Sequence, residues 1–273
     1  MAVMIGAGYT GTAQPLSAPR VCYHSHTPSG TLASSSAAGT DSDWVTDGET
    51  WSVWTAGATT AQINVTFSSA VQIDYIGVAA HTLGSTGAAV RPAFQATSGG
   101  AYVVAPDVLS HSPAGDGALL WLFDPRPVWG VQLQISGGTE AASIGVYQVG
   151  QAMEWPRLST FLGLPIAEAA QIRYRHQQSI RGDVIGRSVE GADLKFEIEI
   201  ANLPETFRDG ADWAGFKDHV QNVGPFFIAP KPQAYPQDVA YARLTDQPRF
   251  NRGIPNRRVS GTVALPCMGY IAP

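Results

Sequence analysis

The sequence predicts a mainly β protein, with an N-terminal jelly-roll β-sandwich followed by a second β-sandwich-like domain that carries one α-helix. Three observations favour this fold class. Only 14% of the 273 residues are charged, while 29 glycines and 19 prolines supply many turn positions. Short runs of β-branched and aromatic residues recur throughout the first half. One segment alone, at about residues 209–223, has a clear helical period.

The first half contains seven predicted strands, separated by clusters of Gly, Ser, Thr and Pro. Apolar residues alternate with polar ones at Ile63, Val65 and Phe67, which is the period of a strand with one buried face. Short strands with regular turn signals are typical of a sandwich or jelly roll. The predicted strands are residues 62–67, 71–80, 89–97, 101–105, 119–123, 128–136 and 143–150.

The second half is expected to begin with a long hairpin. Residues 171–176 and 193–203 both read as strands, because Leu194, Phe196 and Ile198 alternate with charged residues in the second of them. Glycines in the segment between them favour a turn. Three later runs, residues 225–230, 238–245 and 257–266, are also predicted strands.

The single predicted helix lies at about residues 209–223. Its apolar residues follow one another at spacings of three, four and three, so they share one face. Asp209 or Asp212 is the expected N-cap, and Gly224 followed by Pro225 is a strong stop signal. The residues of the apolar face are Trp213, Phe216, Val220 and Val223.

Composition and prolines indicate four regions along the chain. Residues 1–20 are expected to be an N-terminal arm and residues 21–152 a galactose-binding-like jelly-roll domain. Residues 153–165, which contain two prolines and no clear period, are the expected linker. Residues 166–273 then form a β-rich ring or assembly domain.

Charge is distributed unevenly and argues against nucleic acid as a partner. Residues 1–155 hold three basic and ten acidic side chains, a net charge of −7, whereas residues 156–273 hold fourteen basic and twelve acidic ones, a net charge of +2. Nucleic-acid binding depends on Lys and Arg, so nucleic acid is not an expected partner. No window approaches the roughly 20 apolar residues of a membrane span, and no signal peptide is evident at the N-terminus.

The cysteine and histidine pattern predicts no metal site and no disulfide. Cys22 and Cys267 are expected to be free thiols of a protein made in a reducing cytoplasm, and whether they lie near each other stays open. On a regular strand, Cys22, His24 and His26 would share one face and offer three zinc ligands. A fourth ligand at a standard spacing is missing, so we expect neither a metal nor another cofactor.

The most distinctive segment, residues 33–57, holds three tryptophans among acidic residues. Aromatic faces stack on sugar rings, and nearby carboxylates accept hydrogen bonds from hydroxyls, so the segment is a candidate glycan site. The alternative is that Trp51 and Trp54 fill the core beneath a long loop. Trp44 and the acidic residues are expected to face outwards in either case. The candidate glycan-binding residues are Trp44, Asp41, Asp43, Asp47 and Trp54.

The same segment resembles the discoidin-type, galactose-binding-like domains. Trp44 is followed by Asp47-Gly48, then by a strand at residues 62–67 and by the run V-Q-I-D-Y-I-G-V at residues 71–78. The resemblance covers roughly residues 20–152 and implies a jelly-roll fold with a glycan-binding end. Two family features are absent, namely the tryptophan in the first of these strands and the bracketing cysteines. The resemblance therefore supports the predicted fold more strongly than it supports a particular ligand.

A second resemblance concerns the order of the two halves. A sandwich that ends in Ile144-Gly145 and Gly150, a Trp155-Pro156 joint and a later β-rich region is similar to minor tail or tail-tip proteins of long-tailed phages. This resemblance implies a ring at the tail end of a virion, with other tail proteins and copies of the chain as partners. It also implies that the sandwich touches glycans of the host surface.

Three functions follow as hypotheses. The leading one is a structural tail-tip protein with no enzymatic activity, whose second half forms a ring and whose sandwich attaches to a host surface. The runner-up is a free-standing carbohydrate-binding module associated with a glycan-degrading enzyme. A hydrolase using Asp41 and Asp47 is the third, although no catalytic separation is predicted for two residues on one loop. The expected ring contacts are Arg249, Arg252, Arg257 and Arg258.

Overall fold

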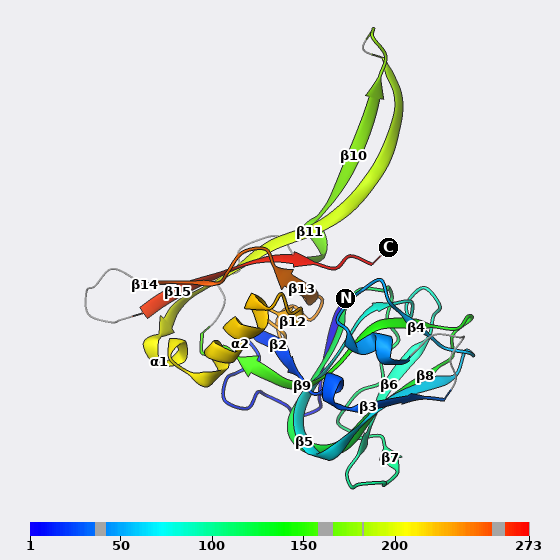
Figure 1. Ribbon diagram of the computed structural model, residues 1–273, viewed down its shortest axis with the longest axis vertical. Helices are drawn as coiled ribbons and strands as arrows, with labels where there is room; N and C mark the ends of the chain where they lie inside the picture. Colours follow the sequence, from blue (N-terminus) through cyan, green and yellow to red (C-terminus); the bar gives the residue numbers. More distant parts are fainter. Residues whose placement is uncertain (36–41, 158–165, 182, 253–259, 273) are drawn as a thin grey trace.

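A computed structural model of the chain describes residues 1–35, 42–157, 166–181, 183–252 and 260–272. The strands of these residues form one 15-stranded sheet, with the order β10-β11-β15-β13-β12-β2-β9-β5-β8-β6-β7 and with β1, β3, β4 and β14 joined to its members. All pairings are antiparallel except that of β1 with β8. The mainly β fold class is thus confirmed (Figure 1).

Two long strands, β5 (Ala61–His81) and β8 (Leu119–Ser136), organise the N-terminal sandwich. The sequence divides each of them into two strands. Each is continuous because the β5–β8 ladder passes through a register shift between Thr66 and Val71, where the chain bends without leaving the sheet. The remaining strands of this half are β1 (Ala2–Ile5), β2 (Arg20–Ser25), β3 (Thr31–Ser34), β4 (Trp54–Thr55), β6 (Ala89–Gln95), β7 (Tyr102–Val103) and β9 (Ser143–Glu154).

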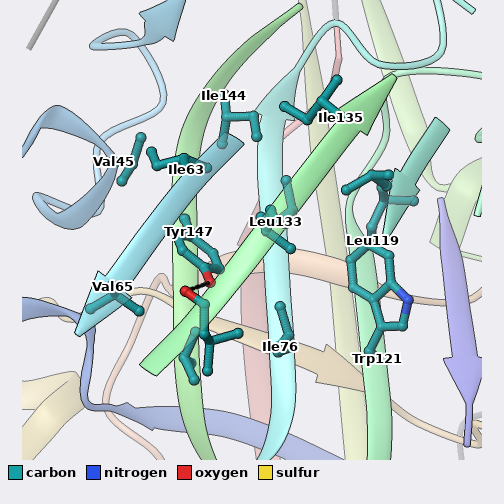
Figure 2. Close-up of a cluster of buried hydrophobic side chains, with 14 of the residues drawn as sticks. Val45, Ile63, Val65, Ile76, Leu119, Trp121, Leu133, Ile135, Ile144 and Tyr147 are labelled. Carbon is teal, nitrogen blue, oxygen red and sulfur yellow. Dashed lines mark hydrogen bonds between the residues drawn. The ribbon is translucent and has the colours of Figure 1, made fainter. Parts of the chain in front are cut away.

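The core of the sandwich lies between these strands. Figure 2 shows Ile63, Ile76, Leu133 and Tyr147 converging from β5, β8 and β9. The Tyr147 hydroxyl is buried with them and donates a hydrogen bond to the carbonyl oxygen of Val131 at 3.3 Å. The second part of β5 pairs with both β8 and β9, and its residues from Ile73 onward are buried on both faces. One face contributes Ile76 to the sandwich core, and the other packs Tyr75 against residues of the second half such as Phe227.

The second half contains the predicted hairpin and the predicted helix. β10 (Ala170–Gln178) and β11 (Val184–Pro204) form a curved two-stranded ribbon that extends away from the rest of the molecule (Figure 1). The other elements are α1 (Glu205–Arg208), α2 (Ala211–Gln221), β12 (Phe226–Ala229), β13 (Ala240–Leu244), β14 (Arg249–Arg252) and β15 (Ser260–Gly269). Three short 3-10 helices complete the description: η1 (Thr27–Ser29), η2 (Ser42–Thr46) and η3 (Ile166–Glu168).

The predicted helix is confirmed over most of its length, but its two ends differ from the prediction. Gly210, and neither Asp209 nor Asp212, is the N-cap, and no side chain caps the helix. Trp213 and Phe216 are buried as expected. Val223 does not share their face: α2 ends at Gln221, and Val223 lies beyond it, exposed and with φ of 59°.

Hydrogen-bonded strands connect the two halves. β2, from the start of the chain, pairs with β9 on one side and with β12 on the other. β9 continues to Glu154, and Trp155 is fully buried against Phe207 and Trp213, so the first residues of the expected linker belong to a strand and to a core. The division into two domains stays a prediction, but one sheet runs through both halves.

The N-terminal arm is held against β2 and β9 by a partly buried charge pair. Glu154 accepts hydrogen bonds from the backbone amides of Thr12, Ala13 and Gln14 at 2.7 to 3.0 Å. Its carboxylate also lies 3.3 Å from the guanidinium of Arg20, which is fully buried. The pair therefore fixes the arm onto β2 and β9 rather than leaving it free.

Candidate functional site

The candidate site is built on the loop of residues 42–52, which we call the tryptophan loop. It begins with η2 and continues into a turn at Asp47-Gly48, where Gly48 has a φ of 75° that favours glycine. One carboxylate oxygen of Asp47 accepts a hydrogen bond from the Glu49 amide at 2.7 Å, and the other accepts one from the Ser52 hydroxyl at 2.6 Å. Asp47 therefore closes the loop with both of its oxygens.

The tryptophan loop is also anchored to the second half of the chain. The carbonyl oxygen of Gly48 accepts a hydrogen bond from the buried Tyr241 hydroxyl at 2.8 Å. Glu49 and Arg243 form an ion pair at 2.7 Å, and both side chains are partly exposed. These contacts hold the loop in one conformation before any ligand arrives.

The three tryptophans have three different environments. Trp44 is 43% exposed, Trp51 is 80% exposed and Trp54 is fully buried in the sandwich core. The outward position of Trp44 agrees with the sequence analysis, and the core position of Trp54 agrees with one of its two alternatives. The expectation that Trp51 fills the core is wrong, because Trp51 lies on the loop surface. Trp54, which we included among the glycan contacts, has no exposed surface to offer to a sugar.

Two cavities flank the turn of the tryptophan loop. The first, of about 330 Å³, lies between Gly48–Thr50 and the second half. Its other lining residues are Leu194, Tyr241, Ala242, Arg243, Met268, Gly269, Tyr270 and Ile271. The second, of about 430 Å³, is lined by Thr46, Asp47 and Gly48 together with residues of β2, Gln148 of β9 and the C-terminal part of α2. The candidate site thus lies where the two halves meet.

The sandwich carries a strongly negative net charge. Of its three arginines, Arg20 is buried with Glu154, and Arg126 is paired with Asp107, which lowers the pKa of that carboxyl. Arg91 is exposed. Asp43 and Asp47 are exposed on the tryptophan loop itself. The field around the loop therefore favours neutral or cationic ligands over anionic ones.

A buried carboxyl lines a third cavity, which contains no residue of the tryptophan loop. Asp74 of β5 is 7% exposed, and one of its oxygens accepts a hydrogen bond from the Ala152 amide at 2.7 Å. Burial is the largest influence on it and raises its pKa to about 7, and the nearby Glu154 carboxylate also raises the pKa. The cavity that it lines, of about 370 Å³, also borders Tyr23, His24 and Asp212.

The alternation of Cys22, His24 and His26 does not place these residues on one face. β2 has a register shift between Val21 and His24 against β9, which turns Cys22 into the core and leaves His24 exposed. Within the described ranges, no group of three His, Cys, Asp or Glu side chains is arranged to hold a metal ion. Cys22 and Cys267 are free and buried, and burial raises the pKa of both thiols.

Several expected site residues fall outside the described ranges or outside the loop. Asp41, Arg257 and Arg258 lie outside the described residues. Arg249 and Arg252 are the end residues of β14, which pairs with β15. The ring contacts expected of these arginines stay a prediction.

The residues that sequence reasoning missed come from the second half. Tyr241, Arg243 and Tyr270 line the first cavity, but they lie about 190 residues or more beyond the tryptophan loop along the chain. No spacing rule connects them to Gly48 or Glu49. The charge of Arg243 opposite the acidic loop was the only available signal.

In the part of the chain that the structure describes, no helix is long and apolar enough to cross a membrane.

No model of a protein family matches this sequence, nor does any curated protein. Several solved structures are similar to part of the chain. The chitosan-binding module 1 of a chitosanase/glucanase from Paenibacillus sp. IK-5 is 15% identical at a TM-score of 0.40, over 46% of this chain and 98% of that one. The family 32 carbohydrate-binding module of NanJ from C. perfringens, in complex with galactose, is 16% identical at a TM-score of 0.40, over 48% of this chain and 98% of the module.

A third similar structure is a fucosidase from Ruminococcus gnavus in complex with fucose, which is 8% identical at a TM-score of 0.39. The likeness covers 46% of this chain and 26% of the fucosidase. Each likeness spans less than half of this chain, and similarity at this level does not identify its ligand. The mainly β fold class therefore rests on the chain's own strands and their pairing.

Proposed function

We propose that the protein is a non-enzymatic glycan-binding protein whose ligand stacks on the tryptophan loop. The observation that carries this proposal is the 80% exposure of Trp51 on a loop held at both sides. A large apolar ring in water costs free energy unless a ligand covers it. Because the loop is already held by Asp47 and Arg243, little conformational entropy is lost when a ligand binds.

The geometry of Asp47 favours binding over hydrolysis. A catalytic carboxylate needs an oxygen that faces the substrate, whereas both oxygens of Asp47 accept hydrogen bonds within the loop. These hydrogen bonds support a role for Asp47 in holding the tryptophan loop rather than in acid–base catalysis. This role also explains why an Asp-Gly pair follows Trp44.

The ligand is expected to be uncharged or cationic. Residues 1–155 carry a net charge of −7, and the exposed Asp43 lies beside Trp44 on the loop. An acidic polysaccharide would meet repulsion at this surface. Neutral polysaccharides bind through stacking and hydroxyl contacts, which the acidic field does not oppose.

A glycan array tests this proposal. The whole chain is applied to neutral, amino-sugar and uronate-containing oligosaccharides at physiological salt, alongside Trp51→Ala. We expect binding to neutral or amino-sugar chains and none to uronates, with at least tenfold weaker binding for Trp51→Ala. Equal binding of the variant, or a preference for uronates, would contradict the proposed site.

A second function, assembly as a structural part of a phage-like tail tip, is favoured by the projecting ribbon. β10 and the first ten residues of β11 pair with each other and, among the described strands, with no other. A lone two-stranded ribbon is marginally stable in water, and its open edges are templates for pairing. Ile180 at its tip is fully exposed, and Ile185 is 68% exposed.

The charge of the ribbon indicates that its partner is a second copy of the chain. Residues 171–188 contain four arginines and one acidic residue, and the side chains of Arg173, Arg175 and Arg181 are exposed. The sandwich carries the opposite charge. Contact between the ribbon of one copy and the sandwich of the next is head-to-tail, which closes into a ring when the rotation permits. Such a ring at a virion tail tip would present the tryptophan loops to a host surface.

Shortening the ribbon tests the assembly function. Ile172 and Ala192 are paired, so replacing residues 173–191 by a two-residue turn keeps the remaining ladder in register. We expect the whole chain to form oligomers that dissociate at high salt, and the shortened chain to remain monomeric with an unchanged melting temperature. Sedimentation velocity at low and high salt measures the oligomeric states, and thermal unfolding at high salt, where both chains are expected to be monomeric, compares the melting temperatures. A wild-type chain that stays monomeric at all concentrations would exclude the ring.

A further inference from the structure

The first cavity, between Gly48–Thr50 and the second half, has the composition of a sugar subsite. Its walls combine the Glu49–Arg243 ion pair, which is 2.7 Å long and partly exposed, with Tyr270 and Met268. A paired carboxylate and guanidinium offer acceptors and donors to the hydroxyl groups of a sugar without adding net charge. Tyr270 and Met268 add apolar surface for the C–H face of a ring.

The cavity is formed before a ligand binds. Tyr270 donates its backbone amide to the Tyr241 carbonyl at 2.8 Å, and the Tyr241 hydroxyl donates to Gly48 at 2.8 Å. One chain of hydrogen bonds thus links the wall from the second half to the wall from the tryptophan loop. Its volume of about 330 Å³ is at the lower end of the range for small-molecule sites.

The cavity is adjacent to the exposed tryptophan. Thr50 lines it, and Trp51 is the next residue, so their Cα atoms are about 3.8 Å apart. Trp51 itself does not line the cavity. A ligand that stacks on Trp51 and also fills the cavity has to contact two separate surfaces, and this favours an oligosaccharide over a monosaccharide.

We propose that the cavity between Gly48–Thr50 and Tyr270 is a second subsite, and that the ligand is an uncharged oligosaccharide bound by both halves of the chain. This inference rests on the proposed glycan-binding function and adds to it a minimum ligand length and specificity residues from the second half. Trp51 binds one unit of the chain. Arg243, Tyr270 and Met268 bind the next.

Titration calorimetry with a neutral monosaccharide, disaccharide and tetrasaccharide of the series selected on the array tests the subsite. For the unmodified chain we expect affinity to rise about tenfold or more with length. Met268→Ala/Tyr270→Ala should remove that gain, so that the tetrasaccharide binds no better than the monosaccharide. Tyr235→Ala, which changes an exposed tyrosine outside the cavity, is the matched control and should keep the full length dependence.

The outcomes separate the subsite from the proposed function. If Trp51→Ala abolishes binding while Met268→Ala/Tyr270→Ala keeps the same gain with length as the unmodified chain, the subsite is wrong and glycan binding stands. If the unmodified chain binds no glycan of any length, the proposed function fails and the subsite fails with it. Circular dichroism of each variant confirms that the fold is retained.

Discussion

Replacing Trp54 by alanine is expected to lower the free energy of unfolding by about 3–5 kcal/mol, whereas the same change at Trp51 leaves it nearly unchanged. The reason is burial. Trp54 is fully enclosed in the sandwich core, so its removal loses the transfer free energy of the ring and leaves a cavity. Trp51 is 80% exposed and loses little.

Urea unfolding of the two variants measures this contrast, and glycan binding supplies the opposite readout. Trp51→Ala should retain the midpoint of unfolding and lose affinity. Trp54→Phe, which keeps an aromatic ring in the core, is the control and should recover most of the stability lost in Trp54→Ala. Equal losses of stability for Trp51→Ala and Trp54→Ala would contradict the environments described for the two rings.

Asp74→Asn is expected to stabilise the protein by about 2–4 kcal/mol at pH 8 and to change the pH dependence of stability. Burial raises the pKa of Asp74 to about 7, so the folded protein binds a proton that the unfolded chain releases near pH 4. Stability from this group is therefore present at low pH and is lost as the pH rises from about 4 to about 7. An asparagine keeps the acceptor for the Ala152 amide and carries no charge to bury.

Buried His81 has the opposite effect on the pH dependence of stability, so the two groups can be distinguished by the direction of that dependence. Burial lowers its pKa to about 4, while its Nε2 lies 2.9 Å from the Gly117 carbonyl, so the neutral ring is the folded form. Stability from this group is lost as the pH falls from about 6.5 to about 4. Once Asp74 is replaced, thermal unfolding should show stability that rises between pH 4 and pH 6.5. A variant whose stability still falls from pH 4 to pH 7 would contradict the assignment to Asp74.

The sequence predicted the elements with strong periodicity and missed the contacts between distant elements. Leu194, Phe196 and Ile198 alternate with charged residues, and this pattern places them correctly in β11. The continuity of β5 and β8 was not predicted, because serines and prolines within them resemble turn signals. A paired register shift carries both strands through these residues.

The tryptophan loop shows the same limit at the candidate site. Trp51 and Trp54 are three residues apart on an irregular segment, where no period decides which ring is buried. In the structure, the Ser52 hydroxyl donates a hydrogen bond to Asp47 across this segment, and Trp51 lies outside on the loop surface. Arg243, nearly 200 residues further along the chain, forms an ion pair with Glu49 of the loop, and no local sequence pattern predicts this contact.

The indole N–H signals of the protein test the central claim most directly. The chain has seven tryptophans, of which Trp54, Trp121, Trp155 and Trp213 are fully buried. Heteronuclear NMR with a neutral tetrasaccharide, with Trp51→Phe and Trp44→Phe to assign the two loop signals, should show shifts in those two signals and none in the four buried ones. Binding that leaves the Trp51 and Trp44 signals unchanged would contradict the assignment of the glycan site to the tryptophan loop.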